Sequence, residues 1–457
     1  MAIQKLFVAN RGEIAVRIIR AAKALGVGTV QAASAADKEM LAARLADETV
    51  EIGPAHATKS YLHKDAVVAA AVASGADAIH PGYGFLAENA EFAEKVEAAG
   101  LIFVGPTPET IRAMGDKAMA REIATRAGVR TVSGSDGRIE GVESALSAAA
   151  RIGYPIMIKA AAGGGGRGIR VADTPAELER QIPEAIAEAS AAFGDGGLYL
   201  ERFVAWARHI EVQVLGDGKD VIHLYERECS LQRRRQKVWE EAPAACLTPD
   251  LREALCASAV QLAKSVRYRG AGTLEYLYDE VAREFFFIEM NTRIQVEHPI
   301  TEMITGVDLV QAMIRIASGE PLPFSQSDIV IRGHAVEVRI NAEDPARNFM
   351  PAPGRVTKFA MPEGSGVRFD TLLYEGYVIP PFYDSLLGKL IVGGETRPAA
   401  LARLRSALGA LTIEGVPTTR DLHLALLDDE SVKNGAVHTR WLEGWLALGP
   451  LNKGKAA

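Results

Sequence analysis

Short hydrophobic runs alternate with amphipathic stretches through the first quarter of the chain. Residues 5–10 and 27–32 have the composition of buried strands, and residues 14–25 between them place apolar side chains at helical spacing and end at Gly26. A strand, a helix and a second strand of these lengths predict a βαβ unit. Further strands are expected at residues 76–80 and 101–104. The pattern predicts a doubly wound α/β domain that extends to about residue 114.

The middle of the chain contains a glycine-rich stretch between two expected strands. Residues 154–158 form the first strand, Lys159 follows it, and residues 169–172 form the second. Residues 163–168 between them match Gly-x-Gly-x-x-Gly, but a dinucleotide site needs a helix after the glycines, and a strand is expected here. A strand, a glycine loop and a strand indicate a lid whose N–H groups can approach phosphates. A plain mobile loop is the alternative, and the adjacent cations Lys159 and Arg167 favour phosphate.

Two apolar and aromatic runs, residues 272–278 and 285–288, predict a β-hairpin. Folding this hairpin about residue 282 sets Glu275 opposite Glu289. Cross-strand partners lie about 5 Å apart, which is close enough for two carboxylates to share Mg²⁺. Other strands of this region are expected at residues 198–204 and 208–214.

Polar and aliphatic side chains alternate after the hairpin. Ile294 and Val296 are even-numbered, whereas the odd positions are polar: Glu289, Asn291, Arg293, Gln295 and Glu297. If the segment remains extended, the polar set shares one face. A polar sheet edge with salt bridges is one interpretation. Two carboxylates, two amides and a guanidinium on one face favour metal-assisted chemistry on a small anion.

Each of these residue types suits one part of such chemistry. A carboxylate such as Glu289 at a strand end suits Mg²⁺. The planar fork of Arg293 fits a carboxylate, bicarbonate or phosphate. Glu297 can accept a proton from an anion that Arg293 holds.

The last third of the chain contains another alternating strand, at residues 332–345. Val336, Val338 and Ile340 lie on one side, and Glu337, Arg339 and Asn341 share the other. Read alone, this pattern makes Arg339 an ordinary ion-pair partner of Glu337.

Residues 233–237 form the most basic stretch, with four cations in five positions. A solvated basic face is one interpretation. The neighbouring Trp239, Glu240 and Glu241 favour an internal network of charges.

These patterns divide the chain into an α/β domain (1–114), a central domain (115–334) with a lid at about 131–203, a β-rich domain (335–446) and a tail (447–457), of which residues 451–457 are expected to fray.

Composition and charge narrow the functional classes. The 457 residues are 48% hydrophobic and 24% charged, which is typical of a globular enzyme. The net charge of −7 argues against a general nucleic-acid binder, and apolar runs fall short of the ~20 residues of a membrane span. Cys229, Cys246 and Cys256 fit neither a disulfide framework nor a zinc site, and the N-terminus does not resemble a signal peptide. A cytoplasmic setting is expected.

Three long motifs carry a resemblance to one family. Glu289-Met-Asn-Thr-Arg-Ile-Gln-Val-Glu-His-Pro299 resembles the signature of biotin carboxylases, members of the ATP-grasp superfamily. Ala9-Asn-Arg-Gly-Glu-Ile14 and His80-Pro-Gly-Tyr-Gly-Phe-Leu86 resemble the N-terminal domain of the same family. The resemblance covers roughly residues 3 to 446. It implies an N-terminal biotin carboxylase domain, an ATP-grasp domain with a glycine-rich lid, and a biotin carboxylase C-terminal domain.

The resemblance also implies an activity: carboxylation of biotin with ATP, Mg²⁺ (or Mn²⁺) and bicarbonate, through carboxyphosphate. It assigns catalysis to Lys237, Arg293, Glu297 and Arg339. Of these, Arg339 would stabilise the enolate-like oxygen of ionised biotin. It assigns bicarbonate to Lys237, Arg293, Gln295 and the Val296 N–H, and the metal to Glu275, Glu289 and Asn291. It assigns the nucleotide to Lys117, Lys159, Gly164, Gly165, Gly166, Glu201, Val204, His209, Gln232, Arg235 and Leu277. Asp384 is implied to be structural or close to biotin.

Some of these positions have a simpler interpretation without the resemblance. Lys117 alone is a surface lysine, and a single histidine such as His209 is more often structural than a ligand. In the family, the acid at Glu201 hydrogen-bonds the exocyclic amine of adenine. Arg235 departs from the family, which usually has His and sometimes Asn there.

Partners are implied as well. The sequence contains no Ala-Met-Lys-Met biotinylation segment, so a separate biotin carboxyl carrier protein and a carboxyltransferase subunit are expected. Arg20 and Arg368 match dimer contacts of the family, and a homodimer is expected, although Ala24 replaces an acid and Ser365 an aromatic residue. The acceptor of the complete carboxylase is not indicated.

Two other functions fit parts of the pattern. An ATP-grasp ligase with an amine acceptor would share the lid, but the Arg293–Glu297 cluster favours bicarbonate. A non-catalytic nucleotide-binding subunit would be expected to lack a metal acid or the base, and Glu275, Glu289 and Glu297 are all present. A nicotinamide oxidoreductase is disfavoured because the glycines precede a strand.

Overall fold

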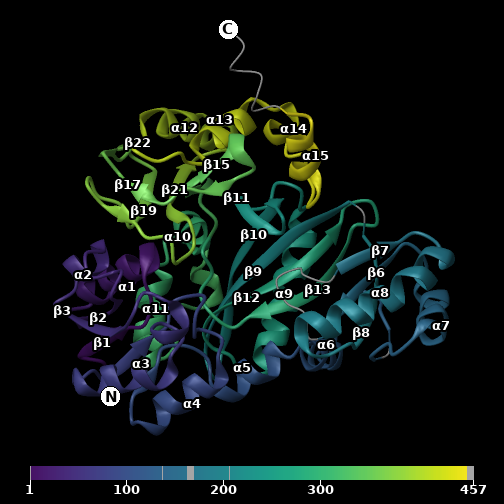
Figure 1. The fold of residues 1–457 in the computed structure, drawn as a ribbon, viewed down its shortest axis with the longest axis horizontal. Helices are drawn as coiled ribbons and strands as arrows, with labels where there is room; N and C mark the ends of the chain where they lie inside the picture. Colours follow the sequence, from purple (N-terminus) through teal and green to yellow (C-terminus); the bar gives the residue numbers. More distant parts are fainter. Residues whose placement is uncertain (1, 136, 162–168, 205, 450–457) are drawn as a thin grey trace.

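The computed structural model describes residues 2–135, 137–161, 169–204 and 206–449. A long sheet crosses the middle of the molecule (Figure 1). The N-terminal α/β unit lies beside it at the lower left, a small sheet with α7 (Val142–Ile152) and α8 (Pro175–Phe193) lies at the right, and the C-terminal helices lie at the top.

The N-terminal unit is a parallel sheet in the order β3-β2-β1-β4-β5. Its strands are β1 (Lys5–Val8), β2 (Gly28–Ser34), β3 (Glu48–Gly53), β4 (Ala78–His80) and β5 (Ile102–Phe103). Its helices are α1 (Gly12–Ala24), α2 (Leu41–Leu45), η1 (Ala57–Lys59), α3 (Lys64–Ala73), α4 (Ala90–Ala98) and α5 (Pro108–Gly115). The strand order reverses direction at β1, so the predicted doubly wound α/β fold is confirmed.

Eight antiparallel strands form the central sheet, in the order β13-β12-β9-β10-β11-β14-β21-β19. They are β9 (Ala207–Asp217), β10 (Val221–Arg233), β11 (Gln236–Ala242), β12 (Arg269–Asp279), β13 (Glu284–Asn291), β14 (His334–Asn341), β19 (Val367–Thr371) and β21 (Leu386–Gly394). Because β14 pairs with β11, the expected central and C-terminal domains share one sheet across the boundary at residue 334.

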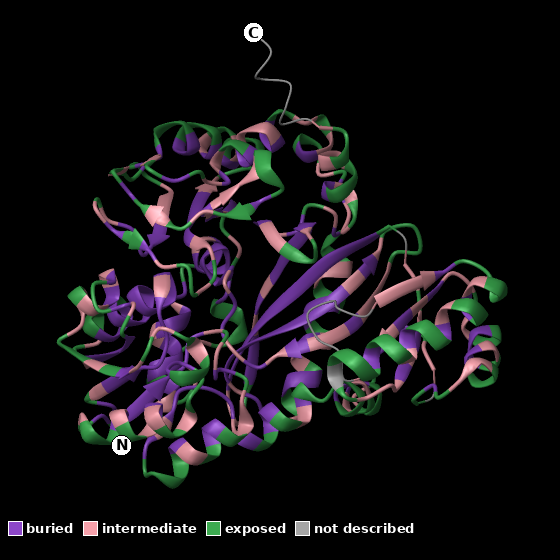
Figure 2. Ribbon diagram, in the orientation of Figure 1, coloured by how far each residue is buried: buried purple, intermediate pink, exposed green. Residues whose placement is uncertain are grey.

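Side-chain alternation gives this sheet one apolar and one polar face. On β9, Ile210, Val212 and Val214 are fully buried and belong to the same apolar cluster as the helix α9 (Pro249–Ser265). On β14, the aliphatic positions pack in the cluster that includes α12 (Arg397–Ala410). The odd-numbered residues of both strands point the other way. Figure 2 shows the resulting buried strands and the exposed outer surfaces of the surrounding helices.

The small sheet at the right has the order β7-β6-β8. Its strands are β6 (Ile156–Ala160), β7 (Ile169–Ala172) and β8 (Leu198–Arg202). A strand follows the glycine-rich stretch, as predicted, so the dinucleotide interpretation is wrong for this segment. The glycines at 163–168, including Gly164, Gly165 and Gly166, lie outside the described residues.

Several helices begin with a Thr-Pro pair. Thr107 and Thr174 precede α5 and α8, and their side chains accept hydrogen bonds from the backbone N–H groups of Thr110 and Glu177. A threonine N-cap followed by a proline is a favoured helix start, because the proline lacks an N–H that would otherwise be unpaired.

The remaining elements connect these units. In the central region they are α6 (Lys117–Arg126), α10 (His298–Thr305), α11 (Leu309–Ala317) and η2 (Gln326–Asp328). In the C-terminal region they are β15 (Glu343–Asp344), η3 (Pro345–Arg347), β16 (Met350–Pro351), β17 (Gly354–Arg355), β18 (Lys358–Ala360), β20 (Val378–Ile379), β22 (Thr412–Glu414), α13 (Arg420–Asp428), α14 (Glu430–Lys433) and α15 (Trp441–Ala447).

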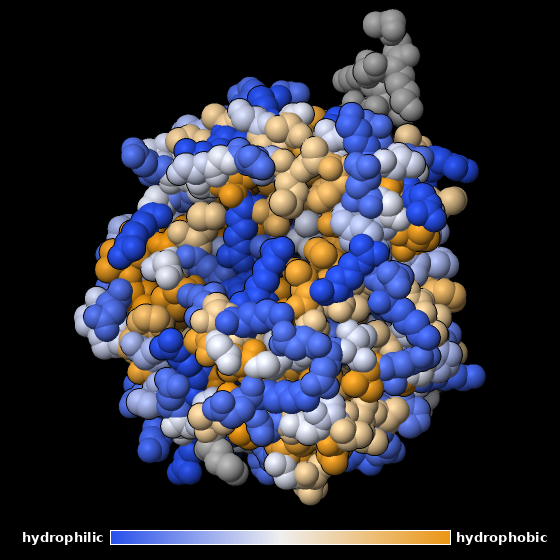
Figure 3. All heavy atoms as spheres, turned by 90° about the vertical axis from the view of Figure 1, so that its left-hand side faces the viewer, coloured by the Kyte–Doolittle hydropathy of each residue, from blue (hydrophilic) through white to orange (hydrophobic). Residues whose placement is uncertain are grey.

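On the face shown in Figure 3, hydrophilic side chains separate the hydrophobic ones. Within the described ranges, none of the helices has the length and hydropathy of a membrane-spanning segment. The three cysteines, two buried and one half-buried, are free thiols.

Candidate active site

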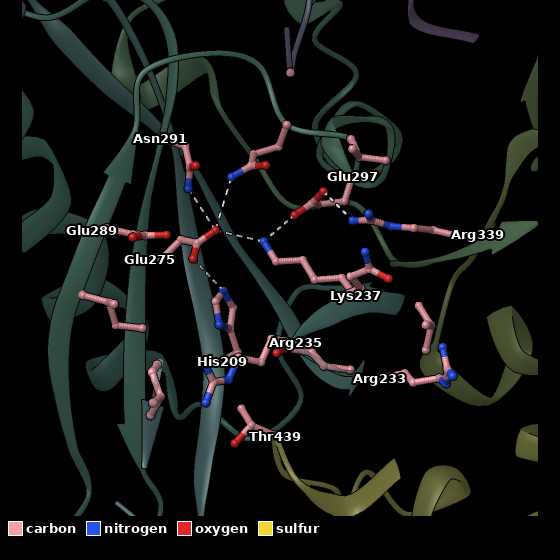
Figure 4. A pocket seen from close by; sticks show the side chains of 18 of the residues that line it. His209, Arg233, Arg235, Lys237, Glu275, Glu289, Asn291, Glu297, Arg339 and Thr439 are labelled. Atoms are coloured by element: carbon pink, nitrogen blue, oxygen red, sulfur yellow. Dashed lines mark hydrogen bonds and ion pairs between the residues drawn. The ribbon is translucent and has the colours of Figure 1, made fainter. Parts of the chain in front are cut away.

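A cavity of about 1310 Å³ lies over the polar face of the central sheet. Its lining comes from the N-terminal unit, the small sheet, the central strands and the C-terminal region. Figure 4 shows side chains from the central strands pointing into it.

The hairpin of β12 and β13 has the predicted register, with Glu275 paired with Glu289. Burial would raise the pKa of Glu275, but the Lys237 ammonium and His209 hold it below its ordinary range. The pKa of Glu289 is raised by burial and by the nearby charge of Glu275. The two acids therefore repel each other, and a cation between them would relieve this repulsion.

The segment after Asn291 differs from the prediction. β13 ends at this residue, and residues 292–297 form bends and a turn, so the expected extended alternation is wrong. The turn nevertheless gathers the polar side chains. Arg293 donates to the Gln295 side-chain oxygen at 2.9 Å and to the Asn291 side-chain oxygen at 3.0 Å. Gln295 donates to Glu275 at 3.3 Å.

Lys237 is the centre of the charge network. Its Nζ donates to Glu211 at 2.5 Å, to Glu275 at 3.0 Å and to Glu297 at 2.6 Å. Burial would lower the pKa of Lys237, but these three carboxylates raise it well above its ordinary value. Figure 4 shows Lys237 between Glu275 and Glu297. An ammonium here joins the hairpin to the turn that carries Glu297.

Arg227 joins this network of charges through Glu211. It is fully buried, and its Nε donates to Glu211 at 2.6 Å. Its other nitrogens donate to Gln213, Thr273 and Thr301. The pKa of Glu211 lies well below its ordinary value, because the two cations outweigh the effect of burial. Glu211 therefore remains an anion that holds Lys237 in place.

Arg339 does not pair with Glu337, so the simpler interpretation of its strand is wrong. Its Nε donates to Glu240 at 2.7 Å, and its Nη2 donates to Glu297 at 3.0 Å. Glu240 reaches Arg339 because β11 and β14 are neighbours, a pairing between distant parts of the chain. Arg339 and Lys237 thus contact the same carboxylate, that of Glu297.

The other end of the cavity lies between β12, β13 and the small sheet. Lys117 Nζ lies 3.8 Å from Glu289, and Lys159 is paired with Glu201. Arg121 also donates to Glu201, at 2.6 Å. Because both oxygens of Glu201 already accept hydrogen bonds from cations, its carboxylate has less capacity for the predicted contact with adenine.

The remaining candidate residues for the nucleotide also line the cavity: Val204, His209, Gln232, Arg235 and Leu277. Asp384, which the resemblance implies to be structural or close to biotin, lines it as well. His209 Nε2 lies 3.3 Å from Glu275, and although burial lowers the pKa of His209, that carboxylate raises it to about 9. Asp384 accepts from the Leu386 N–H at 2.8 Å.

The C-terminal region contributes to this end as well. Thr439, Arg440 and Glu443 line the cavity, and Glu443 accepts from the Arg234 N–H at 3.1 Å. Arg234 and Arg235 have φ of 47° and 63°, so this turn adopts a backbone conformation that is unfavourable for arginine. The sequence had indicated an internal network for this basic run; Lys237 belongs to one, whereas Arg234 and Arg235 are exposed.

The donor set fits Mg²⁺. Glu275 and Glu289 offer carboxylate oxygens from paired strands, and Asn291, the last residue of β13, adds an amide oxygen two residues after Glu289. Hard oxygen ligands with partly open coordination are typical of magnesium sites that also hold phosphates.

Sequence reasoning missed several contributors. Glu88 accepts from Arg293 Nε at 2.8 Å and comes from the N-terminal unit. Arg227 and Lys389 are fully buried charged residues under the site, and so is Glu240, for which the sequence indicated a charge network but no partner. A charged residue within a strand is the only local signal for these three, and it does not identify a partner on another strand.

The chain is similar to known proteins along most of its length. Residues 2–111 match the family model for the N-terminal domain of biotin carboxylase, residues 116–325 match the ATP-binding domain of the carbamoyl-phosphate synthase L chain, and residues 337–444 match the C-terminal domain of biotin carboxylase. A curated biotin carboxylase of Pseudomonas aeruginosa is 55% identical over 448 residues, which are 98% of this chain and 99% of the relative.

Solved structures are equally similar. A crystal structure of a biotin carboxylase–βγ-ATP complex from Campylobacter jejuni has a TM-score of 0.93 and 45% identity, covering 97% of this chain and 99% of that one. The biotin carboxylase domain dimer of the Hydrogenobacter thermophilus 2-oxoglutarate carboxylase, in complex with MgADP, ADP and bicarbonate, has a TM-score of 0.92 and 47% identity, covering 98% and 99%.

Proposed function

Because this chain belongs to the biotin carboxylase family, we propose that it catalyses the ATP-dependent carboxylation of biotin with bicarbonate, the first half-reaction of a biotin-dependent carboxylase. The observation that carries this proposal is the convergence of Lys237, Arg339 and Glu297. Lys237 on β11 and Arg339 on β14 both contact the carboxylate of Glu297, which lies four residues after Arg293. This arrangement suits a base held beside an anion-binding site.

Bicarbonate would bind to Arg293, Gln295, Lys237 and the Val296 N–H. Glu297 would remove its proton, and the bicarbonate oxygen would attack the γ-phosphorus of ATP. The bond from that phosphorus to the β–γ bridging oxygen breaks, which gives ADP and carboxyphosphate. The Arg293 guanidinium is pre-oriented for this role, because Glu88, Asn291 and Gln295 each accept one of its hydrogen bonds.

Glu275, Glu289 and Asn291 would hold Mg²⁺, which when bound supplies positive charge next to the phosphates. Lys117, Lys159 and His209 would contact the nucleotide, together with the cavity residues Glu201, Val204, Gln232, Arg235 and Leu277. The backbone of Gly164, Gly165 and Gly166 would cover the phosphates.

Carboxyphosphate would decompose to CO₂ and phosphate beside biotin. The phosphate would take the N1 proton of biotin, and the N1 electron pair would form the new bond to CO₂. Arg339 would stabilise the negative charge that develops on the ureido oxygen of biotin. Its position is suited to this task, since Glu240 and Glu297 hold the guanidinium from two sides.

The partners of this chain are proposed on the same family basis. We propose that a biotin carboxyl carrier protein presents the biotin, that a carboxyltransferase subunit uses the product, and that the setting is cytoplasmic. The matched Hydrogenobacter domain was crystallised as a dimer. A homodimer is proposed for this chain, with Arg20 exposed and Arg368 bonded to Glu302 at 2.7 Å.

The test is ADP release from Mg-ATP while bicarbonate and free biotin are varied. Release that requires bicarbonate and accelerates with biotin is expected. Release without any requirement for bicarbonate would overturn the proposal and favour a ligase with another substrate. Release that needs bicarbonate and ignores free biotin would be repeated with a biotinylated carrier domain, and indifference to that carrier as well would exclude biotin as the acceptor.

A further inference from the structure

A fully buried lysine lies next to the proposed base without touching the cavity. Lys389, on β21, has an exposed fraction of 0%. Its Nζ donates to the Val296 carbonyl at 2.8 Å and lies 3.1 Å from the Glu13 carboxylate. Lysine is almost never fully buried unless it is paired, because removing the ammonium from water costs several kcal/mol. Packing alone therefore does not explain why a lysine, rather than an apolar residue, occupies this position.

The Val296 carbonyl belongs to the peptide that leads into Glu297. Residues 292–297 are neither helix nor strand. The peptide between Val296 and Glu297 is therefore not held by the regular backbone hydrogen bonds of a helix or a sheet. Glu297 is the N-cap of α10, and α10 restrains it from the following side only. The bond from Lys389 restrains it from the preceding side. The direction of the Glu297 side chain depends on that peptide.

Glu13 holds Lys389 in turn. It lies in the first turn of α1, in the N-terminal unit, and the Tyr83 hydroxyl donates to the same carboxylate oxygen that faces Lys389. Burial raises the pKa of Glu13, and the Lys389 ammonium opposes that effect. The chain of contacts thus runs from the N-terminal unit through β21 to the backbone of the base.

The register of the sheet explains why Lys389 can serve here. Lys389 pairs directly with Arg339 on β14, so the two long cations stand side by side on one face. Arg339 reaches the Glu297 carboxylate, whereas Lys389 reaches the backbone before it. The neighbouring Glu337 has a strongly raised pKa because of burial, and within the described part of the chain neither of its oxygens has a hydrogen-bond partner. Among the described residues, Glu13 is the carboxylate with which Lys389 forms an ion pair, at 3.1 Å.

We propose that Lys389 and Glu13 are positioning residues for Glu297, and that they connect the N-terminal unit to the geometry of the base. This inference rests on the proposed function. Neither residue is assigned to substrate contact. Their loss is expected to impair proton removal from bicarbonate and to leave nucleotide binding intact, because the candidate nucleotide residues belong to other elements of the cavity.

The experiment uses Glu13→Gln and Lys389→Met in the full chain, with Lys358→Met as a matched control. Lys358 is also a strand lysine paired with a glutamate, but its side chain is 61% exposed. Glu13→Gln keeps the shape of the side chain and removes its charge. For each protein, kcat of bicarbonate-dependent ADP release and the Kd of Mg-ATP are measured.

Lys389→Met should lower kcat about 100-fold, as expected when a reacting group is displaced by about 1 Å. Glu13→Gln should lower kcat about tenfold, as is usual for residues that orient a site from behind. The Kd of Mg-ATP should remain within about twofold, and Lys358→Met should match the parent in both quantities. If Lys389→Met fails to fold, Glu13→Gln provides the same test.

A kcat of Glu13→Gln within about twofold of the parent would overturn the inference, and so would a loss of Mg-ATP affinity equal to the loss of kcat. The second result would indicate a general structural defect. Failure of the proposed function is distinguishable, because the parent protein itself would then release ADP without a requirement for bicarbonate.

Discussion

Glu240 and Glu241 are adjacent on β11 and have opposite electrostatic environments, which allows a sharp test of the charge network. Burial raises the pKa of Glu240 to about 7, although Arg339 opposes this shift. Within the described residues, one oxygen of Glu240 has no hydrogen-bond partner. Burial would also raise the pKa of Glu241, but hydrogen bonds from His334 and Arg397 lower it to about 2.

The sign of each contribution to stability follows from these shifts. The folded protein binds the Glu240 proton more tightly than the unfolded chain does, so the stabilisation from Glu240 is present below pH 4.5 and is lost as the pH rises through about 7. One unit of pKa corresponds to about 1.4 kcal/mol, so the change from 4.5 to about 7 is worth about 3 kcal/mol. The stabilisation from Glu241 is present above 4.5 and is lost only as the pH falls through about 2.

The assay is thermal unfolding of the parent, Glu240→Gln and Glu241→Gln between pH 5 and pH 8. Stability of Glu240→Gln relative to the parent should rise with pH, by up to about 3 kcal/mol across this range. Glu241→Gln should be less stable than the parent by about 3 kcal/mol at every pH in the range, because the Glu241 charge is constant there. If the offset of Glu240→Gln did not vary with pH, Glu240 would not titrate in this window and the reasoning would be refuted.

Four further predictions concern the residues and the metal of the site. Arg293→Ala should abolish bicarbonate-dependent biotin carboxylation and keep most of the ATP affinity, as measured by steady-state kinetics and nucleotide titration; loss of ATP binding would contradict the assigned role. Lys237→Met should lower the free energy of unfolding by about 3–5 kcal/mol, because three buried carboxylates lose one shared cation, and added Mg²⁺ should restore part of the thermal stability. Glu289→Gln should raise the Mg²⁺ concentration needed for half-maximal ADP release by about 10–100-fold with little change in the apo stability, and an unchanged Mg²⁺ requirement would exclude Glu289 as a ligand. Chelation of Mg²⁺ should stop ADP release in the parent, and Mg²⁺ or Mn²⁺ should restore it.

The parts of the site that could be predicted from the sequence depend on short-range geometry. The Glu275–Glu289 pair followed from the position of one turn and the two-residue period of a strand. The pairs next to the turn are centred between residues 281 and 282, and the bulge between Glu275 and Tyr276 shifts the register by one residue, which brings Glu289 rather than Ile288 opposite Glu275. The lid strands and the doubly wound sheet were likewise accessible, because each is built from neighbouring segments of the chain.

The partners of Arg339 and Arg293 could not be predicted in this way. Local spacing favoured Glu337 for Arg339, but the observed partner is Glu240, which depends on the pairing of β11 with β14. Arg293 is held by Glu88, which lies 205 residues earlier in another unit. A residue's period within its own strand carries no information about which distant strand becomes its neighbour.

The shared sheet explains why the site needs long charged side chains. Glu275 on β12 and Arg339 on β14 are separated by four strand spacings of about 4.8 Å, or about 19 Å along the sheet. Lys237, on a strand between them, contacts Glu275 at 3.0 Å and Glu297 at 2.6 Å, and Glu297 contacts Arg339 at 3.0 Å. The metal end and the Arg339 end are therefore connected by charged contacts rather than by the backbone. Such a connection can respond when a nucleotide or an anion adds charge at either end, whereas the strands beneath it remain fixed by their hydrogen bonds.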